Sequence, residues 1–206
     1  MTPKQTSLFD TGENTPLKTA YENHRLFSRN VFEQAVAAAA KAGAGQGDEE
    51  LSEAIRLAVS EKRPDPIVSI LWPASESIES GALALRGKKE TKTAAILLKS
   101  DPSDQAACGM LIKLSHKLNA PWGMISNGTD WRLFNASRLA APEKWFDISL
   151  ENACLDVVTR EIFFSVLGPR ASGKGIAAEE LFCMSRAETI KIRTSLGRAA
   201  RTAAEE

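Results

Sequence analysis

The chain has 206 residues, of which 43% are hydrophobic and 6% aromatic, and its 26 Lys and Arg balance its 26 Asp and Glu. This length accommodates one core with appendages and excludes a fused multidomain enzyme within the sequence. The even charge argues against a protein that coats nucleic acid by bulk electrostatics. No apolar run approaches the roughly 20 residues that span a bilayer, and no secretory signal is apparent, so we expect a cytoplasmic protein.

The first third of the chain predicts a tail and two helices. Residues 1–17 contain one apolar pair and are expected to form a flexible tail. Apolar residues at helical spacing predict a helix within 17–42. Acidic residues at 48–50 open a second helix, which we expect Pro64 and Pro66 to end.

The middle of the chain changes to short β-branched runs, which are typical of strands. The predicted order is three strands, a helix and two strands. The strands are expected at 67–72, 81–85, 93–98, 122–126 and 131–134, and the helix, with its N-terminal cap within 100–103, carries its apolar face between 106 and 118. Asn127-Gly128 predicts a tight hairpin turn between the last two strands.

Beyond Pro142 the chain is expected to be helical, with an apolar stripe over 155–166 and a last, basic helix over 177–201. We therefore predict three parts: a tail (1–17), an α/β domain (18–140) and a helical extension (141–206). The three cysteines, Cys108, Cys154 and Cys183, lie far apart among apolar neighbours and are expected to be buried and reduced. His24 and His116 are expected on helix surfaces.

The most specific segment runs from Pro121 to Phe134 and contains Ser126-Asn-Gly followed by Trp131-Arg-Leu-Phe. It resembles the nuclease-type N-terminal region of type IIG restriction-methyltransferases and type I restriction subunits, in which such a turn and strand close the nuclease sheet. Arg25-Leu-Phe-Ser28 and Phe146-Asp-Ile-Ser-Leu150 also resemble that group. The resemblance implies a restriction-endonuclease-like mixed α/β sheet, DNA as a partner, and a methyltransferase domain or subunit as a further partner in a bacterial restriction-modification (defence) protein.

Enzymes of that PD-(D/E)XK group use an acid on one strand, then an acid, any residue and a lysine on the next, with the two carboxylates holding Mg²⁺. The resemblance makes Lys99 the motif lysine and Gln105 a glutamine that follows it in some members. The carboxylate positions fall at Leu97 and near Ala82, which are apolar. We therefore expect a degenerate site without a cofactor, in a domain that engages DNA or acts as a scaffold.

An active Mg²⁺-dependent endonuclease is the first alternative. Glu90-Thr-Lys92 satisfies the acid-x-lysine pattern, and Glu79 lies upstream as a second acid. The same triplet also arises by chance in a Lys/Glu-rich turn. Around that turn Arg86, Lys88, Lys89 and Lys92 are candidates for phosphate contacts, and ordinary solvated charge explains them equally well.

Two further segments carry weaker predictions. Residues 168–175 fit a phosphate-binding loop with Gly173 and Lys174, but glycine occupies the position of the usual Ser/Thr, so a loop between helices is favoured over a nucleotide-binding protein. In the tail, Gln5, Leu8 and Phe9 resemble the peptide by which bacterial DNA-processing proteins attach to the sliding clamp. An accidental apolar pair is the alternative for the tail.

Overall fold

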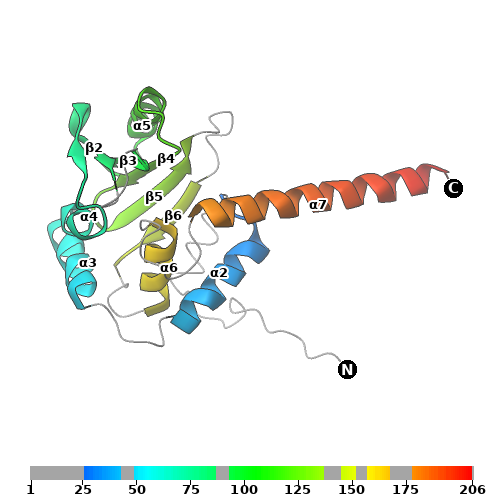
Figure 1. Ribbon diagram of the computed structural model, residues 1–206, viewed down its shortest axis with the longest axis horizontal. Helices are drawn as coiled ribbons and strands as arrows, with labels where there is room; N and C mark the ends of the chain where they lie inside the picture. The colour runs from blue at the N-terminus through cyan, green and yellow to red at the C-terminus, as the bar shows by residue number, and fades with distance from the viewer. Residues whose placement is uncertain are drawn as a thin grey trace.

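A computed structural model of the chain describes residues 26–42, 49–86, 93–136, 145–151, 157–167 and 178–205. Within these ranges a mixed β-sheet lies between helices (Figure 1). The helices are α2 (Arg29–Ala42), α3 (Glu49–Glu61), α4 (Asp65–Leu71), α5 (Gln105–Lys117), α6 (Val157–Leu167), α7 (Ala178–Glu205) and the 3₁₀ turn η1 (Glu79–Gly81). The strands are β1 (Glu76–Ser77), β2 (Ala82–Leu85), β3 (Ala95–Lys99), β4 (Trp122–Ser126), β5 (Asp130–Asn135) and β6 (Trp145–Ser149).

The six strands lie in the sheet in their order along the chain. Only β3 and β4 are parallel neighbours, and every other neighbouring pair is antiparallel. A parallel pair needs a crossover connection, and α5 provides it. The carboxyl ends of β3 and β4 therefore meet at one edge of the sheet, where Lys99 and Ser126 are register partners.

Helices cover the two faces of the sheet unequally. Helix α5 packs on one face, against Ile96 and Ile125. Helices α2, α3, α4, α6 and α7 contribute to the larger core on the other face. Alternate strand residues such as Leu97 and Phe146 point into that larger core, as the two-residue period of a strand requires.

In the larger core, aromatic rings bring together segments that are far apart in the sequence. The ring of Phe146 on β6 lies 5.7 Å from those of both Phe27 and Phe32. Trp131 on β5 meets Phe163 on α6 edge-on at 5.2 Å. Strands, α2 and α6 therefore share one packed interior, and the boundary expected at residue 140 precedes the last strand of the sheet.

The first predicted strand is wrong. Residues 67–72 belong to α4 and its C-terminal cap, and the first strand of the sheet is the short β1 further along the chain. The preceding helix does end before Pro64 and Pro66, as expected, but proline in a first helical turn loses no hydrogen bond and has a suitable φ. The prolines therefore begin a helix whose β-branched residues pack into the core.

The helix expected immediately beyond Pro142 is also wrong over 145–149, where β6 pairs with β5 along its whole length. Three smaller expectations need correction. Residues 26–28 are not helical, the side chain that caps α5 belongs to Asp104, and Cys183 is exposed. Cys154 and His24 lie outside the described residues, and His116 is exposed on α5, as expected.

The hairpin of β2 and β3, the hairpin of β4 and β5, and the last helix are confirmed. Among the described residues, none of the helices has both the length and the apolar character needed to cross a bilayer.

The base of α7 is fixed to the body of the protein, and the rest of the helix projects from it (Figure 1). Leu181 is fully buried, and Phe182 packs edge-on against Trp122 with ring centres 5.9 Å apart. Ser28 donates its backbone N–H to Ser185 Oγ and its hydroxyl to Glu188, and Asn30 also donates to Glu188. These bonds fix the direction in which the helix leaves the body.

Glu188 should make this attachment sensitive to acid. Hydrogen bonds from Ser28, then from Asn30, lower the pKa of the Glu188 carboxyl. The contact therefore stabilises the fold above the unfolded-state pKa of about 4.3 and is lost as the pH falls through the lower folded-state pKa. We expect Glu188→Gln to lower Tm slightly at neutral pH and the difference from the native chain to disappear as the pH falls through the lowered folded-state pKa. Thermal melts over a pH series would check this, and a constant difference at every pH would contradict it.

Candidate functional site

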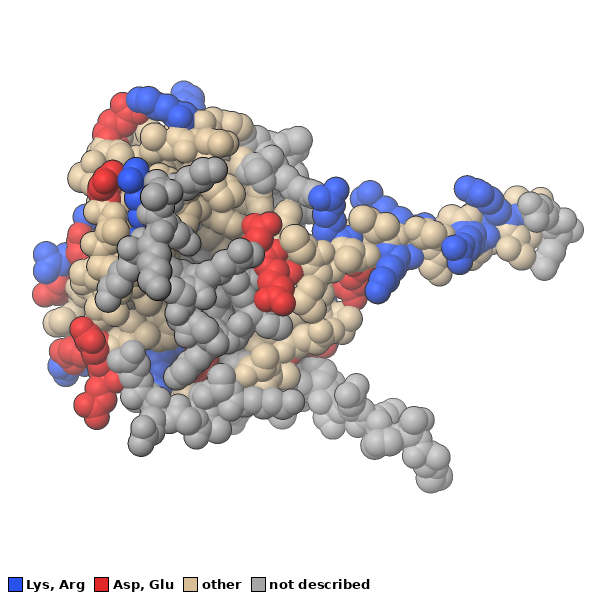
Figure 2. Space-filling model, viewed as in Figure 1, with Lys and Arg blue, Asp and Glu red and all other residues tan. Residues whose placement is uncertain are grey.

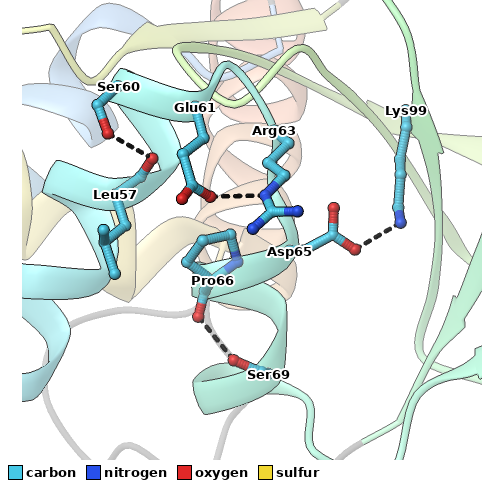
Figure 3. A network of polar contacts seen from close by, with 8 residues as sticks. All are labelled: Leu57, Ser60, Glu61, Arg63, Asp65, Pro66, Ser69 and Lys99. Carbon is cyan, nitrogen blue, oxygen red and sulfur yellow. Dashed lines mark hydrogen bonds and ion pairs between the residues drawn. The ribbon is translucent and has the colours of Figure 1, made fainter.

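The candidate site lies where β3 and β4 end side by side, on the face that carries the larger core. Lys99 is the last residue of β3, and its Nζ lies 2.5 Å from Oδ1 of Asp65 at the start of α4 (Figure 3). Both side chains are partly exposed, at 36% and 44%. The strand thus presents its lysine to a carboxylate that comes from a helix rather than from a neighbouring strand.

The register of the sheet identifies the positions that flank this lysine. Leu97 lies two residues before Lys99, on the same face, and is completely buried. Its partner on β2 is Leu83, whereas Ala82 pairs with Leu98 and belongs to the core on the opposite face. Ala82, near which the resemblance puts the first motif acid, therefore lies on the face opposite to Lys99. The residue that faces the site from β2 is Leu83, which is also apolar.

Asp65 owes its position to the turn between α3 and α4. Helix α3 ends at Glu61 and is followed by Lys62 in the left-handed region, at φ 50°, and Arg63 N–H donates to Ala58 O at 3.1 Å. This bond closes the end of the helix. Pro66, in the first turn of α4, then starts a new helix at once. The side chain of Arg63 bonds Glu61 rather than the lysine site (Figure 3).

The hairpin turn predicted at Asn127-Gly128 packs against the turn between α3 and α4 and holds it in place. Gly128 has φ +98°, and a Cβ there would lie 2.3 Å from the backbone N of Arg63 and 2.6 Å from Ala58 O. Only glycine allows such a close approach. Asn127 does not have the positive φ that we expected of it, and its Oδ1 instead accepts the N–H groups of Thr129 and Asp130.

Buried polar groups complete the turn. Ser126 is fully buried beside Lys99, and its Oγ accepts the Gly128 N–H at 2.9 Å. Trp131 Nε1 donates to Gly128 O at 3.2 Å. The Ser-Asn-Gly…Trp segment thus holds the β4–β5 turn against α3, and the α3–α4 turn carries Asp65 to Lys99. The residues of the Ser-Asn-Gly…Trp segment therefore position the Lys99–Asp65 pair, and their side chains do not reach into it.

The chemistry open to this arrangement follows from its groups. A partly exposed ammonium ion can contact a phosphate oxygen, and a single carboxylate beside it competes for the same charge. A Mg²⁺ site of the nuclease kind needs two carboxylates close together. In the part of the chain that the structure describes, no three His, Cys, Asp or Glu side chains are grouped to hold a metal ion.

Three of the other predicted site residues lie within the described part of the chain. Glu79 pairs with Lys117 at 2.7 Å, and Gln105 is the exposed first residue of α5. Arg86 pairs with Glu76 at 3.2 Å. The remaining predicted residues, Gln5, Leu8, Phe9, Lys88, Lys89, Glu90, Lys92, Gly173 and Lys174, lie outside the described residues.

Residues 157–167, which precede the predicted phosphate-binding loop, form the helix α6. A phosphate-binding loop of the nucleotide-binding kind follows a strand. The structure of the preceding segment therefore favours the loop between helices over a nucleotide site.

Sequence reasoning missed two polar features. Asp65 was overlooked because its neighbours were assigned to a strand, although an acid between two prolines is a signal for the first turn of a helix. Arg132 on β5 forms two hydrogen bonds with Asp147 on β6, at 2.6 and 2.8 Å, and lies over the Trp145 ring at 4.7 Å. The alternation of Trp145, Asp147 and Ser149 with apolar residues was the available signal for that strand.

The electrostatics of the Arg132–Asp147 pair indicate a structural role. The hydrogen bonds to Asp147 raise the pKa of Arg132 further, so its charge is permanent. Burial raises the pKa of the neighbouring Cys108 thiol, which opposes formation of the reactive thiolate. The cluster therefore ties β5 to β6 and supplies no activated nucleophile.

Comparison with protein-family models, curated proteins and solved structures finds no match to this chain.

Proposed function

We propose that this chain is a DNA-engaging domain of restriction-nuclease type, part of a cytoplasmic restriction-modification system, that binds DNA without cutting it. One observation carries the proposal. Lys99, which the resemblance makes the motif lysine, ends β3 beside the parallel strand β4. The residues on its face of β3 and β2, Leu97 and Leu83, are apolar where a metal site of that kind would need carboxylates.

The order of elements supports the proposal. Strands β1 to β3 pair antiparallel, α5 forms the crossover and β4 lies parallel to β3, which is compatible with the mixed α/β sheet that the resemblance implies. The Ser126–Phe134 segment, which carries that resemblance, forms the β4–β5 hairpin.

Loss of the carboxylates removes cleavage and leaves the means to bind. Without two acids, Mg²⁺ has no ligand set with which to polarise a phosphodiester. A lysine at a strand end still contacts phosphate oxygens, which are the main source of affinity in protein–DNA complexes. Asp65 lowers the local positive charge, so Asp65→Asn should tighten DNA binding modestly, whereas Lys99→Gln should weaken it.

Binding and cleavage are tested together by incubating the full chain with plasmid DNA in the presence of Mg²⁺ or Mn²⁺. We expect retarded migration that protease treatment reverses, with the supercoiled plasmid recovered intact. Metal-dependent cleavage that is lost in Lys99→Ala, or in Lys92→Ala for the alternative site, would contradict the proposal. Lys113→Ala, which changes an exposed lysine of α5, is the matched control.

A further inference from the structure

Charge is distributed unevenly along α7, whose acidic residues lie at 179, 180, 188 and 205, outside the projecting stretch between them. Overall the chain carries equal numbers of basic and acidic residues. The projecting part of α7, residues 189–204, contains Lys191, Arg193, Arg198 and Arg201 and no acid, so it carries four positive charges and no negative ones. Figure 2 shows these blue side chains along the projecting helix.

The arginines of the body are mostly neutralised by neighbours. Those of α2, α3 and the adjoining turn pair with Glu33, Glu53 and Glu61. Arg86 and Arg132 pair with carboxylates of the sheet. Among the described residues, Arg193, Arg198 and Arg201 form no ion pair. The guanidinium groups of α7 therefore remain available to an external anion.

The four cations share one side of the helix. At about 100° per residue, Lys191, Arg193, Arg198 and Arg201 fall within roughly 160° of the circumference. The opposite side continues the buried stripe of Ala178, Leu181 and Ser185 with Ile192, Leu196 and two alanines. The exposed part of that stripe has no aromatic residue and only two large apolar side chains, Ile192 and Leu196, which is a poor composition for insertion into a membrane surface.

We propose that the basic side of α7 binds the phosphate backbone of duplex DNA. A lone helix is about 10–12 Å across with its side chains, and the major groove is about 12 Å wide. Residues 189–204 extend about 24 Å, a large part of one helical turn of DNA. Three of the four cations are arginines, whose planar donors match phosphate oxygens in pairs. The fixed base of α7 presents this side in a constant direction.

The inference rests on the proposed function, because it names the surface by which the domain engages DNA. It also gives a chain of even net charge a means to bind DNA, because residues 189–204 carry four cations and no acid. Because α7 beyond Ser185 is almost wholly exposed, neutral substitutions there should leave the folded body intact.

The test measures binding of the full chain to a fluorescent duplex by anisotropy over a range of salt concentrations. The variant Arg193→Gln/Arg198→Gln/Arg201→Gln removes three charges from α7 and keeps helix-forming side chains. Its control, Arg29→Gln/Arg56→Gln/Lys117→Gln, removes three charges that are paired on the body. Circular dichroism and Tm should show that both variants are folded.

We expect the α7 variant to bind at least about tenfold more weakly and its slope of log K against log [salt] to fall by roughly 0.9 per lost contact. The control should keep the affinity within about twofold, because its cations are already neutralised and exposed ion pairs contribute little. Equal affinity and slope in native chain and α7 variant would overturn the inference and leave the proposed function standing. A native chain that binds no duplex overturns both, including the case in which it binds anionic vesicles instead.

Discussion

Replacing Gly128 with alanine is expected to lower the free energy of unfolding by about 3 kcal/mol. The new Cβ would lie 2.3 Å from the backbone N of Arg63, and φ at this position is +98°. Neither backbone can yield without moving the β4–β5 turn away from α3. The same displacement would separate Asp65 from Lys99, so DNA affinity should change together with stability. Urea denaturation would measure the loss of stability.

Gly109→Ala is the matched control for this substitution. Gly109 lies on the exposed side of α5, and a Cβ there would meet nothing within 4 Å. Alanine in a helix is more favourable than glycine, so this variant should be more stable by about 0.5–1 kcal/mol. Similar losses in both variants would mean that the contact between the turn and α3 is not what Gly128 provides.

Replacing Phe146 with alanine is expected to cost about 3–5 kcal/mol. The ring is fully buried in β6 and meets Phe27 and Phe32 from the opposite end of the described chain. Its removal leaves a cavity at the point where β6 and α2 are joined. A shortened chain that ends at residue 140 should fail to give one cooperative unfolding transition, because it lacks β6 and α6.

Ile192→Ala provides the control for Phe146→Ala. Ile192 lies on α7 with 53% of its surface exposed, so its truncation should change stability by no more than about 0.5 kcal/mol. If Phe146→Ala proved equally mild, or if residues 1–140 folded cooperatively, then β6 and the following helices would indeed be an extension, as the sequence had suggested.

The sequence was informative where local chemistry and tertiary packing agree. Asn127-Gly128 predicted a hairpin turn between the strands expected at 122–126 and 131–134, because the glycine that the local turn requires is also the residue that lets the turn approach α3. Lys99 was correctly expected at a strand end. The pairing of that lysine could not be predicted, because Asp65 reaches it only through the contact between two turns distant in sequence.

Errors arose where a residue type serves two purposes. Pro64 and Pro66 are compatible with both the end of one helix and the start of the next, and Ile67 and Val68 favour a strand unless a core lies on one side of a helix. Phe146 and Ile148 alternate with polar residues as in a strand. The segment has only five residues, however, and the longer helical stripe after it led to the prediction of a helix. Which side of α7 is exposed depends on which of its residues pack against the rest of the protein, and the sequence alone does not show that contact.

One sample tests most directly whether this domain engages DNA without a metal site. An end-labelled duplex is mixed with the full chain and Mg²⁺, its binding is measured by anisotropy, and the same DNA is then run on a denaturing gel. We predict saturable, salt-sensitive binding and a label that remains entirely at full length. Shortened products that depend on Mg²⁺ and on Lys99 or Lys92, or no binding at any protein concentration, would contradict the account.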